Sequence, residues 1–342
     1  MDFRDTPEYH GGREIILNAV LIGISTIIYG LRLIVRTRMT KSLGLDDALA
    51  GIAYLLLLGL SILDIHDISF GSGAHIKYVP EDLLSKFRIS ITIQMLLYFW
   101  GMAMARFAIL AFIARLVHDR SIIVLSWMVA IVILAQTIAA FVYKLTECGP
   151  AGDILKPIDQ AGIHCAGIAA NDQMLVGHGI VGVAIDMILL FLPIWVIFTK
   201  MMWSRKTLHI IIVLSVGLFA VATGIIRVAL METRNISADI TFQMPSVGIW
   251  TDIEGHVGLW CGCFPALQPL LRIMPGKLKL ISTMNPSTNQ LEKTNFNNTT
   301  KKNLQGGGEH DNEEDSESQR AIVSMEMTDH EREMGGRDVS HA

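Results

Sequence analysis

Seven long apolar segments, separated by short polar stretches, occupy this chain of 342 residues up to about residue 272. Each segment is close to the roughly 20 residues that a helix needs to cross the hydrocarbon core of a bilayer. A segment inside lipid must satisfy its own backbone hydrogen bonds, so segments of this length are expected to be helices. The sequence therefore predicts an all-α membrane protein, a bundle of seven transmembrane helices.

The apolar segments divide the chain into three parts. We expect helices near residues 15–34, 48–65, 89–113, 121–143, 176–198, 208–231 and 249–271. Residues 1–14 would form a short segment before the membrane domain of residues 15–272, and residues 273–342 a polar tail. The tail has few aromatic residues and cannot bury enough apolar surface to fold, so it is predicted to be disordered. It would act either as a solvated tail or as a site for a cytoplasmic signalling partner.

The loop charges predict how the bundle is oriented. The first, third and fifth connections are short and basic, with Arg32, Arg36, Arg38 and Lys41, then Arg115 and Arg120, then Lys200, Arg205 and Lys206. Short loops rich in lysine and arginine stay in the cytoplasm. We therefore expect the N-terminus outside and the C-terminus in the cytoplasm.

Two covalent modifications are compatible with that orientation. Cys148 and Cys165 both lie in the fourth connection, which would be outside, where a disulfide is allowed. Two unpaired thiols are the alternative. Asn235 begins the sequence Asn-Ile-Ser in the sixth connection, also outside, and is a candidate for N-glycosylation.

Four ionisable residues fall inside the predicted helices: Arg106, Asp186, Arg227 and Glu254. Charges at this depth are costly and indicate function by default. Arg227 and Glu254 would share a depth on consecutive helices, and Arg106 could reach Asp186 near the middle of the fifth helix. Either pair could fix helix packing, open as a switch when a ligand binds, or relay protons or ions.

Further polar residues fall in the outer half of the predicted helices. Asp64, His178, Asp252 and His256 are candidates to line an outer polar cavity. Gly258 and Gly262, four residues apart, are predicted to allow a close approach of another helix.

The sequence lacks the residues that several well-known membrane-protein functions require. The seventh segment has no lysine to form the Schiff base of a retinal pigment, so no cofactor is expected. No two histidines are four residues apart, as a membrane zinc hydrolase would need, so no metal is expected. We find no phosphate-binding glycine loop or nucleophile elbow, and therefore no catalytic residue. There is no concentrated basic face for nucleic acid.

The order of the motifs resembles that of the fungal rhodopsin-domain family of integral membrane proteins. The resemblance covers about residues 15–272 and rests on Arg32, Arg36, Arg38, Leu43-Gly44-Leu45-Asp46-Asp47, Gly71, Gly73, His75, Arg106, Cys148-Gly149-Pro150, Cys165, Asp186, Leu192, Pro193, Arg227, Trp250, Glu254, Cys263, Pro265 and Pro269. Asp46 and Asp47 also lie where carboxylates cap the free N–H groups of a helix start.

The resemblance implies one of two roles. The first is a receptor-like protein in the plasma membrane that senses an extracellular or apolar cue without retinal. The second is a membrane protein of secondary-metabolite biosynthesis; in an enzymatic version of this role, Asp186 or Glu254 would act as the acid catalyst on an apolar intermediate. The expected partners are the lipid bilayer and a small molecule of unknown identity.

Overall fold

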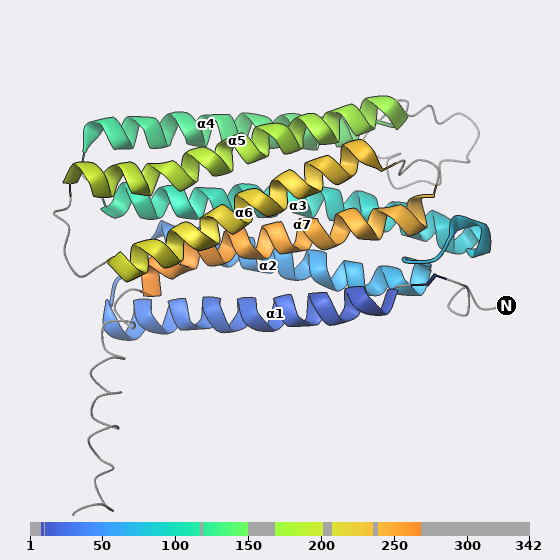
Figure 1. Cartoon of the computed structure of the whole chain (residues 1–342), viewed down its shortest axis with the longest axis horizontal. Helices are drawn as coiled ribbons and strands as arrows, with labels where there is room; N and C mark the ends of the chain where they lie inside the picture. The colour runs from blue at the N-terminus through green and yellow to red at the C-terminus, as the bar shows by residue number, and fades with distance from the viewer. Residues whose placement is uncertain are drawn as a thin grey trace, which may run out of the picture. The chain divides into compact units, whose positions relative to one another are not determined.

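Seven long helices lie side by side along a common direction in the part of the chain that the structure describes (Figure 1). This computed structural model describes residues 8–9, 11–116, 119–149, 168–200, 207–234 and 239–267. The helices are α1 (Gly11–Ile34), α2 (Leu45–Asp67), α3 (Glu81–Leu116), α4 (Arg120–Thr146), α5 (Ile168–Lys200), α6 (Thr207–Thr233) and α7 (Ile240–Cys263). Short helical turns follow three of them: η2 (Val35–Met39), η3 (Ile68–Phe70) and η5 (Phe264–Leu267). The turn η4 (Ile76–Tyr78) precedes α3.

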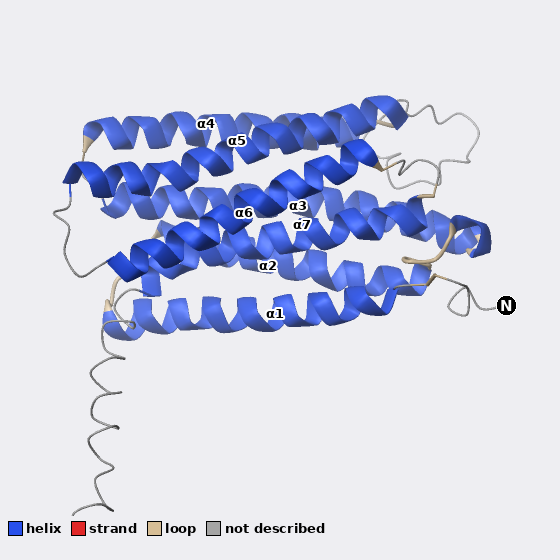
Figure 2. Ribbon diagram, in the orientation of Figure 1, coloured by secondary structure: helices blue, strands red, loops and turns tan. Residues whose placement is uncertain are grey.

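Neighbouring helices along the chain alternate in direction, so α1, α3, α5 and α7 begin at one end of the bundle. We call this the N-terminal end, and the opposite end, where α7 finishes, the C-terminal end. The described residues all belong to one unit, Met1–Met284. Figure 2 shows helices and short loops in this region, which confirms the all-α prediction.

Six of the seven helices, α1 to α6, are long and apolar enough to cross a membrane. Large apolar side chains point outward from them, including Ile16, Trp127, Phe191 and Leu218, which are 60% to 69% exposed. Apolar surface of this extent is stable against lipid and unfavourable against water. The chain is a multi-pass integral membrane protein.

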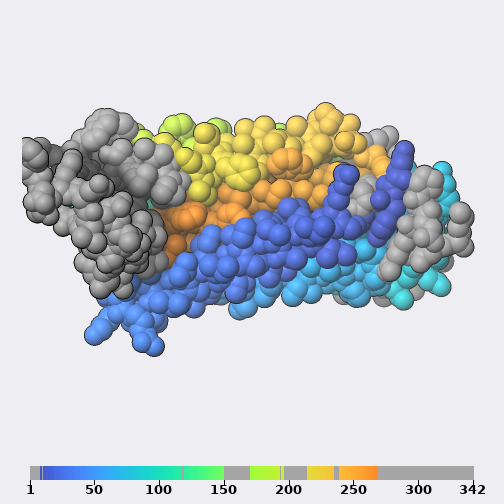
Figure 3. All heavy atoms as spheres, turned by 60° about the horizontal axis from the view of Figure 1, so that its bottom comes forward, coloured from blue at the N-terminus to red at the C-terminus, as the bar shows by residue number. Residues whose placement is uncertain are grey.

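The seventh helix differs from the sequence prediction in position and character. It begins at Ile240 rather than near residue 249, and falls short of the apolar composition of a spanning helix. It nevertheless packs against α1, α2, α3 and α6. On the face in Figure 3, a strip of α7 (orange) is visible between α1 (blue) and α6 (yellow). Its average hydropathy is low because it carries polar residues, and these polar residues are buried inside the bundle, among them Asp252, Glu254 and His256.

Pro245 lies inside α7, and a loop contact explains how the helix tolerates it. Proline has no N–H, so the carbonyl of Thr241, four residues earlier, loses its partner within the helix. That carbonyl instead accepts a hydrogen bond of 2.9 Å from the backbone N–H of Gly73. Gly73 has a φ of 83°, which favours glycine. The loop between α2 and α3 therefore completes the start of α7.

The same loop holds α7 through a histidine–carboxylate pair. His75 Nδ1 lies 2.7 Å from Asp239 Oδ2, and the ring stacks on Phe242 with centroids 3.9 Å apart. The backbone N–H of Ile76 donates to Asp239 Oδ1 at 3.0 Å. Hydrogen bonding to Asp239 raises the pKa of His75 above its usual 6.5, with Glu8 adding to the effect.

We predict that this pair makes stability depend on pH. The protonated His75 ring stabilises the folded protein fully below the unfolded pKa of about 6.5. This stabilisation is lost as the pH rises through the higher folded pKa. The melting temperature of the purified protein should therefore fall as the pH rises above about 6.5. Asp239→Asn should flatten this fall, whereas His66→Gln, which changes an exposed histidine of α2, should keep it. An unchanged profile in Asp239→Asn would contradict the prediction.

The interior is built around α3. More than half of its apolar stretch, 56%, is buried, against 22% to 33% for the other five spanning helices. One apolar cluster joins α3 to α2 and α7 through Leu57, Phe99 and Leu259. A second joins α3 to α4 and α5 through Leu110, Ile133 and Leu189. Residues of α3 therefore face neighbours on nearly every side.

Of the two α7 glycines predicted to allow a close helix approach, Gly262 has a close neighbour and Gly258 does not. A Cβ at Gly258 would meet nothing within 4 Å, and one at Gly262 would lie 3.3 Å from Ile109 Cγ1. The close approach occurs at Gly255, where a Cβ would lie 2.6 Å from Leu57 Cδ2. The prediction was wrong for Gly258 because its spacing does not tell which face of α7 meets α2.

Gly255 and Gly258 form a matched pair for testing this contact. Gly255→Val should lower stability by about 1–3 kcal/mol because it overpacks the buried interface with α2. Gly258→Val places the same side chain on the same helix without a close neighbour, and should change stability by less than about 1 kcal/mol. Melting curves of the two purified variants check this, and equal losses would show that backbone entropy rather than packing decides.

Candidate functional site

Arg106 of α3 and Asp186 of α5 form a two-pronged ion pair in the bundle interior. Arg106 Nε and Nη2 donate to the two carboxylate oxygens of Asp186 at 2.9 and 2.8 Å. Arg106 is 4% exposed, and its Nη2 also donates to the carbonyl oxygen of Gly182 at 3.3 Å. A Cβ at Gly182 would lie 3.1 Å from that nitrogen, so the glycine leaves room for the guanidinium.

Arg227 of α6 and Glu254 of α7 form a second ion pair. Arg227 Nε donates to Glu254 Oε2 at 2.6 Å, and its Nη2 donates to Oε1 at 3.5 Å. Both side chains are almost completely buried, at 2% and 1% exposed. Tyr98 of α3 donates its hydroxyl to Glu254 Oε1 at 3.4 Å, and its ring lies 5.2 Å from the Arg227 guanidinium carbon.

The two pairs form one charge network rather than two separate contacts. Arg106 Nη2 lies 4.0 Å from Glu254 Oε1, so Glu254 faces both arginines. Two positive and two negative side chains balance in a region of low dielectric, where a charge without a partner is strongly unfavourable. We call Arg106, Asp186, Arg227, Glu254 and Tyr98 the charge network. It joins α3, α5, α6 and α7.

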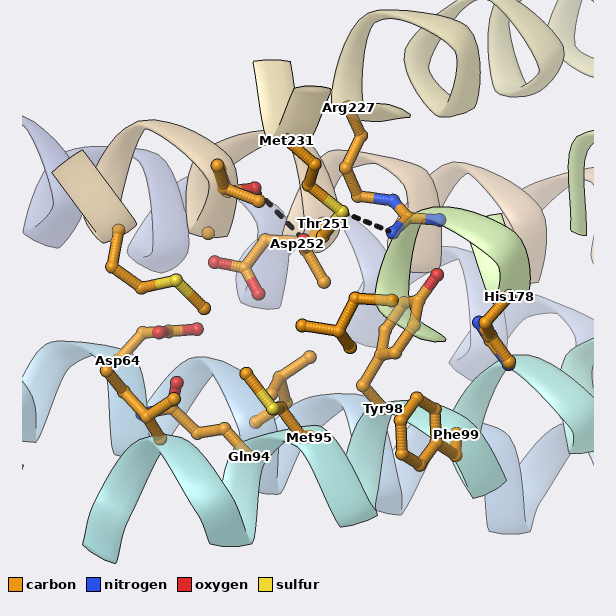
Figure 4. Close-up of a pocket in the computed structure, with 16 residues that line it drawn as sticks. Asp64, Gln94, Met95, Tyr98, Phe99, His178, Arg227, Met231, Thr251 and Asp252 are labelled. Carbon is orange, nitrogen blue, oxygen red and sulfur yellow. Dashed lines mark hydrogen bonds between the residues drawn. The ribbon is translucent and has the colours of Figure 1, made fainter. Parts of the chain in front are cut away.

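A cavity adjoins the charge network toward the N-terminal end (Figure 4). Its volume is about 50 Å³, enough for a few water molecules. The wall includes Tyr98 and Arg227 of the network, which lie beside Asp252 and Thr251 of α7 in the figure. Asp64 of α2 faces Asp252 across the space. A smaller cavity of about 30 Å³ adjoins it, and Asp64 and Asp252 line both.

The smaller cavity is lined by acidic and amide residues. Glu14 and Asn18 come from α1, Asp67 from α2 and Gln94 from α3. Glu14 accepts a hydrogen bond from Ser72 at 2.9 Å, and Asp67 accepts one from Gln94 at 2.7 Å. Sequence reasoning missed Glu14 and Asp67 because they lie just outside the predicted helices, which began at residue 15 and ended at residue 65. We call the two cavities together the acidic cavity.

The candidate residues for an outer cavity fall in two places. Asp64, Asp252 and His178 line the larger cavity, where the His178 ring packs 4.8 Å from that of Phe99. His256 lines neither of the two cavities described. Its ring lies between two hydroxyl groups, with Nδ1 2.7 Å from Ser25 Oγ and Nε2 3.0 Å from Ser61 Oγ. The face of α7 that carries His256 points toward α1 and α2.

Ser25 contacts His256 and also links it to a tryptophan. Trp260 Nε1 donates to Ser25 Oγ at 2.7 Å. Ser25 and Ser61 are completely buried, and His256 is 1% exposed. With both ring nitrogens and both hydroxyls engaged, this group stabilises the packing of α1, α2 and α7.

A further cluster at the C-terminal end explains the Asp46-Asp47 motif. Arg32 is completely buried and donates to Asp46 at 2.7 Å, to Asp47 at 2.8 Å and to the carbonyl of Gly262 at 2.7 Å. Arg36 and Arg115 approach Asp46 at 2.8 and 3.0 Å. Asp47 also accepts a hydrogen bond from the backbone N–H of Gly44 at 3.1 Å, so it caps the helix start as expected in addition to binding arginine. We call these five charged residues the arginine–aspartate cluster.

Some predicted features lie outside the described residues. Cys165, Asn235 and the tail beyond residue 267 belong to this group. Cys148 is described and is disulfide-bonded, whereas Cys261 and Cys263 have free thiols. The pairing of Cys148 with Cys165 and glycosylation at Asn235 stay predictions. Among the described residues, no group of three or more histidine, cysteine or acidic side chains is arranged to hold a metal ion.

Comparison with known protein families gives a match over most of the chain. The model of the fungal rhodopsin domain matches residues 31–273. No curated protein and no solved structure matches the chain. The matched region includes α2 to α7, the charge network, most of the acidic cavity and the arginine–aspartate cluster. This chain belongs to the fungal rhodopsin domain family.

Proposed function

We propose that this protein is a receptor-like membrane protein that senses a small molecule without retinal. In this proposal the N-terminal end of the bundle faces outward and the tail lies in the cytoplasm, because the connections at the C-terminal end are short and basic. The plasma membrane is the proposed location. A disulfide between Cys148 and Cys165 and glycosylation at Asn235 would lie on the outer side.

The contact between the acidic cavity and the charge network supports this proposal most strongly. Tyr98 and Arg227 line the cavity and also bond Glu254. A molecule entering the cavity would therefore touch side chains that hold α3, α6 and α7 together. A ligand shifts a conformational equilibrium by interacting differently with two arrangements of such an element.

The alternative is a membrane protein of secondary-metabolite biosynthesis that acts on an apolar intermediate. An acid catalyst must hold a proton to donate. Asp186 and Glu254, the residues expected for this role, are engaged by arginines at 2.8 and 2.6 Å, so neither carboxyl group is free to meet a substrate. Asp252 is the better candidate in this alternative because its Oδ1 atom is buried without a hydrogen-bond partner.

Deletion of the gene separates the two functions. We expect the deletion strain to lose transcriptional responses to surface or chemical cues while no pathway intermediate accumulates. A strain carrying Tyr98→Phe should lose part of the same response at normal protein level, because this change removes the hydroxyl that reaches Glu254 and little else. Accumulation of one intermediate with all responses intact would overturn the receptor proposal and favour the biosynthetic one.

A further inference from the structure

The acidic cavity gathers carboxyl groups in the bundle interior. Four carboxyl groups line it, Glu14, Asp64, Asp67 and Asp252, and they come from three helices. The lining residues of the smaller cavity include no lysine or arginine. The larger cavity has one arginine, Arg227, and Glu254 engages it at 2.6 Å. The described wall therefore leaves these carboxyl groups without a cationic partner.

Several acceptor atoms in this wall are buried without a hydrogen bond. They are Glu14 Oε1, Asn18 Oδ1, Asp67 Oδ1 and Asp252 Oδ1. Their residues are between 1% and 5% exposed. An unsatisfied buried acceptor is unfavourable by about 1–3 kcal/mol, and more when it is charged. All four atoms accept hydrogen bonds, so the missing complement is a donor.

The two central carboxylates face each other. Asp64 and Asp252 point into the same space in Figure 4, and both line the two cavities. A positive group between two carboxyl groups stabilises their charged forms. Asp252 is the more enclosed of the two and lines both cavities.

The arrangement suits an organic cation better than a metal ion. A metal needs several ligand atoms gathered at one point, and the described acidic and histidine side chains form no such group. An ammonium group carries three N–H donors that point in different directions and can reach separate acceptors. Apolar and aromatic side chains form the other wall, among them Ile91, Met95, Tyr98 and Phe99. These side chains could contact a short carbon chain, and the faces of the aromatic rings could contact the cation.

We propose that the acidic cavity binds the protonated amine of a small organic molecule. Asp252 and Asp64 are the principal acceptors, Glu14 and Asp67 border the smaller space, and the carbon part lies toward Tyr98 and Phe99. The inference names the ligand class of the proposed receptor and rests on that function only for its biological meaning. Binding itself can be tested on the purified protein.

Ethylammonium chloride is a suitable probe because it joins three N–H donors to a short carbon chain. The full chain, purified in detergent at about pH 8, should show a saturable rise in melting temperature of about 3 °C or more with ethylammonium. Sodium chloride at equal ionic strength should give no such rise. Tetramethylammonium chloride, a cation without N–H donors, should not either. Equal effects of either control salt, or no effect of ethylammonium, would overturn the proposal.

Two variants test whether the response comes from this cavity. Asp252→Asn should weaken the apparent affinity for ethylammonium about tenfold or more, since it removes a charged acceptor. Asp82→Asn removes an exposed carboxylate at the same end of the bundle, outside both cavities, and should leave the affinity unchanged. An unchanged affinity in Asp252→Asn would contradict the assignment.

A second pair of variants keeps the test decisive if Asp252→Asn does not fold. Gly248 lines both cavities, and a Cβ there would lie 3.9 Å from Asp64 Oδ1 in ordinary contact. Gly248→Leu should block ethylammonium while every carboxylate remains. Gly258→Leu puts the same side chain on α7 where a Cβ would meet nothing within 4 Å, and should bind as the wild type does. Full ethylammonium binding by Gly248→Leu would overturn the proposal.

The proposed function and this inference can fail separately. Amine-specific binding together with intact cue responses in the deletion strain would sink the receptor function alone. Loss of responses in the deletion strain, without any amine-specific shift of the purified protein, would sink the ligand class alone.

Discussion

Replacing Glu254 with glutamine should reduce the stability of the bundle by about 3–5 kcal/mol, because the change leaves buried arginines without their counter-charge. Glu254 accepts from Arg227 at 2.6 Å and lies 4.0 Å from Arg106, so one substitution unbalances the whole charge network. Glutamine keeps the size of the side chain, so packing changes little. Melting temperature in detergent and the yield of monodisperse protein measure the loss.

A double variant separates charge pairing from other effects. Arg227→Gln in the same protein removes the stranded cation and should recover part of the loss. Recovery will be incomplete because Tyr98 then donates to a neutral amide instead of a carboxylate, and Arg106 retains Asp186 alone. Glu232→Gln, an exposed carboxylate on α6, serves as the matched control and should stay near wild type. Strictly additive losses in the double variant would argue against direct pairing of Arg227 with Glu254.

The second large effect is expected at Arg32. Arg32→Gln should lower stability by about 3–5 kcal/mol, because a completely buried guanidinium bonds Asp46, Asp47 and the backbone of Gly262. The change removes contacts that tie α1 to α2 and to the end of α7. Melting curves of the purified variant provide the measurement.

Arg32→Lys and Arg38→Gln sharpen this test. Lysine keeps the charge but cannot reproduce the planar fork that reaches three acceptors, so Arg32→Lys should lose a large part of the same stability. Arg38 lies in the next turn and is exposed, so Arg38→Gln should be nearly neutral. If Arg32→Lys matched wild type, the positive charge rather than the bonding geometry would explain the cluster.

The sequence alone predicted the helices α1 to α6 because their apolar length is a property of consecutive residues. The predicted start positions were less accurate: α3 and α5 each begin eight residues before the predicted positions, and α7 begins nine residues before, at Ile240 rather than residue 249. Two local signals misled the prediction: a proline inside the helix and several buried polar residues. Only the loop that supplies Gly73 to the Thr241 carbonyl shows why the helix extends through Pro245.

For the charged residues too, the sequence predicted one part of the arrangement and only the structure revealed the other. Depth along a helix can be counted from sequence, and it brought Arg106 near Asp186 and Arg227 near Glu254. The rotation of each helix cannot be counted in this way, because lipid-facing and core-facing surfaces are both apolar. That rotation joins the pairs at Glu254 and turns His256 toward Ser25 and Ser61.

The sequence by itself therefore determined that the chain folds in a lipid bilayer, that it is helical and which family it resembles. These properties depend on the length of the apolar segments and on the order of the motifs. The tertiary structure decided which charges share one network and which carboxylates meet in one cavity. Glu14, Asp64 and Asp252 come from α1, α2 and α7. Depth along the helices placed Asp64 and Asp252 in the same half of the bundle, but only the packing of three helices brings Glu14 to them and sets which faces meet.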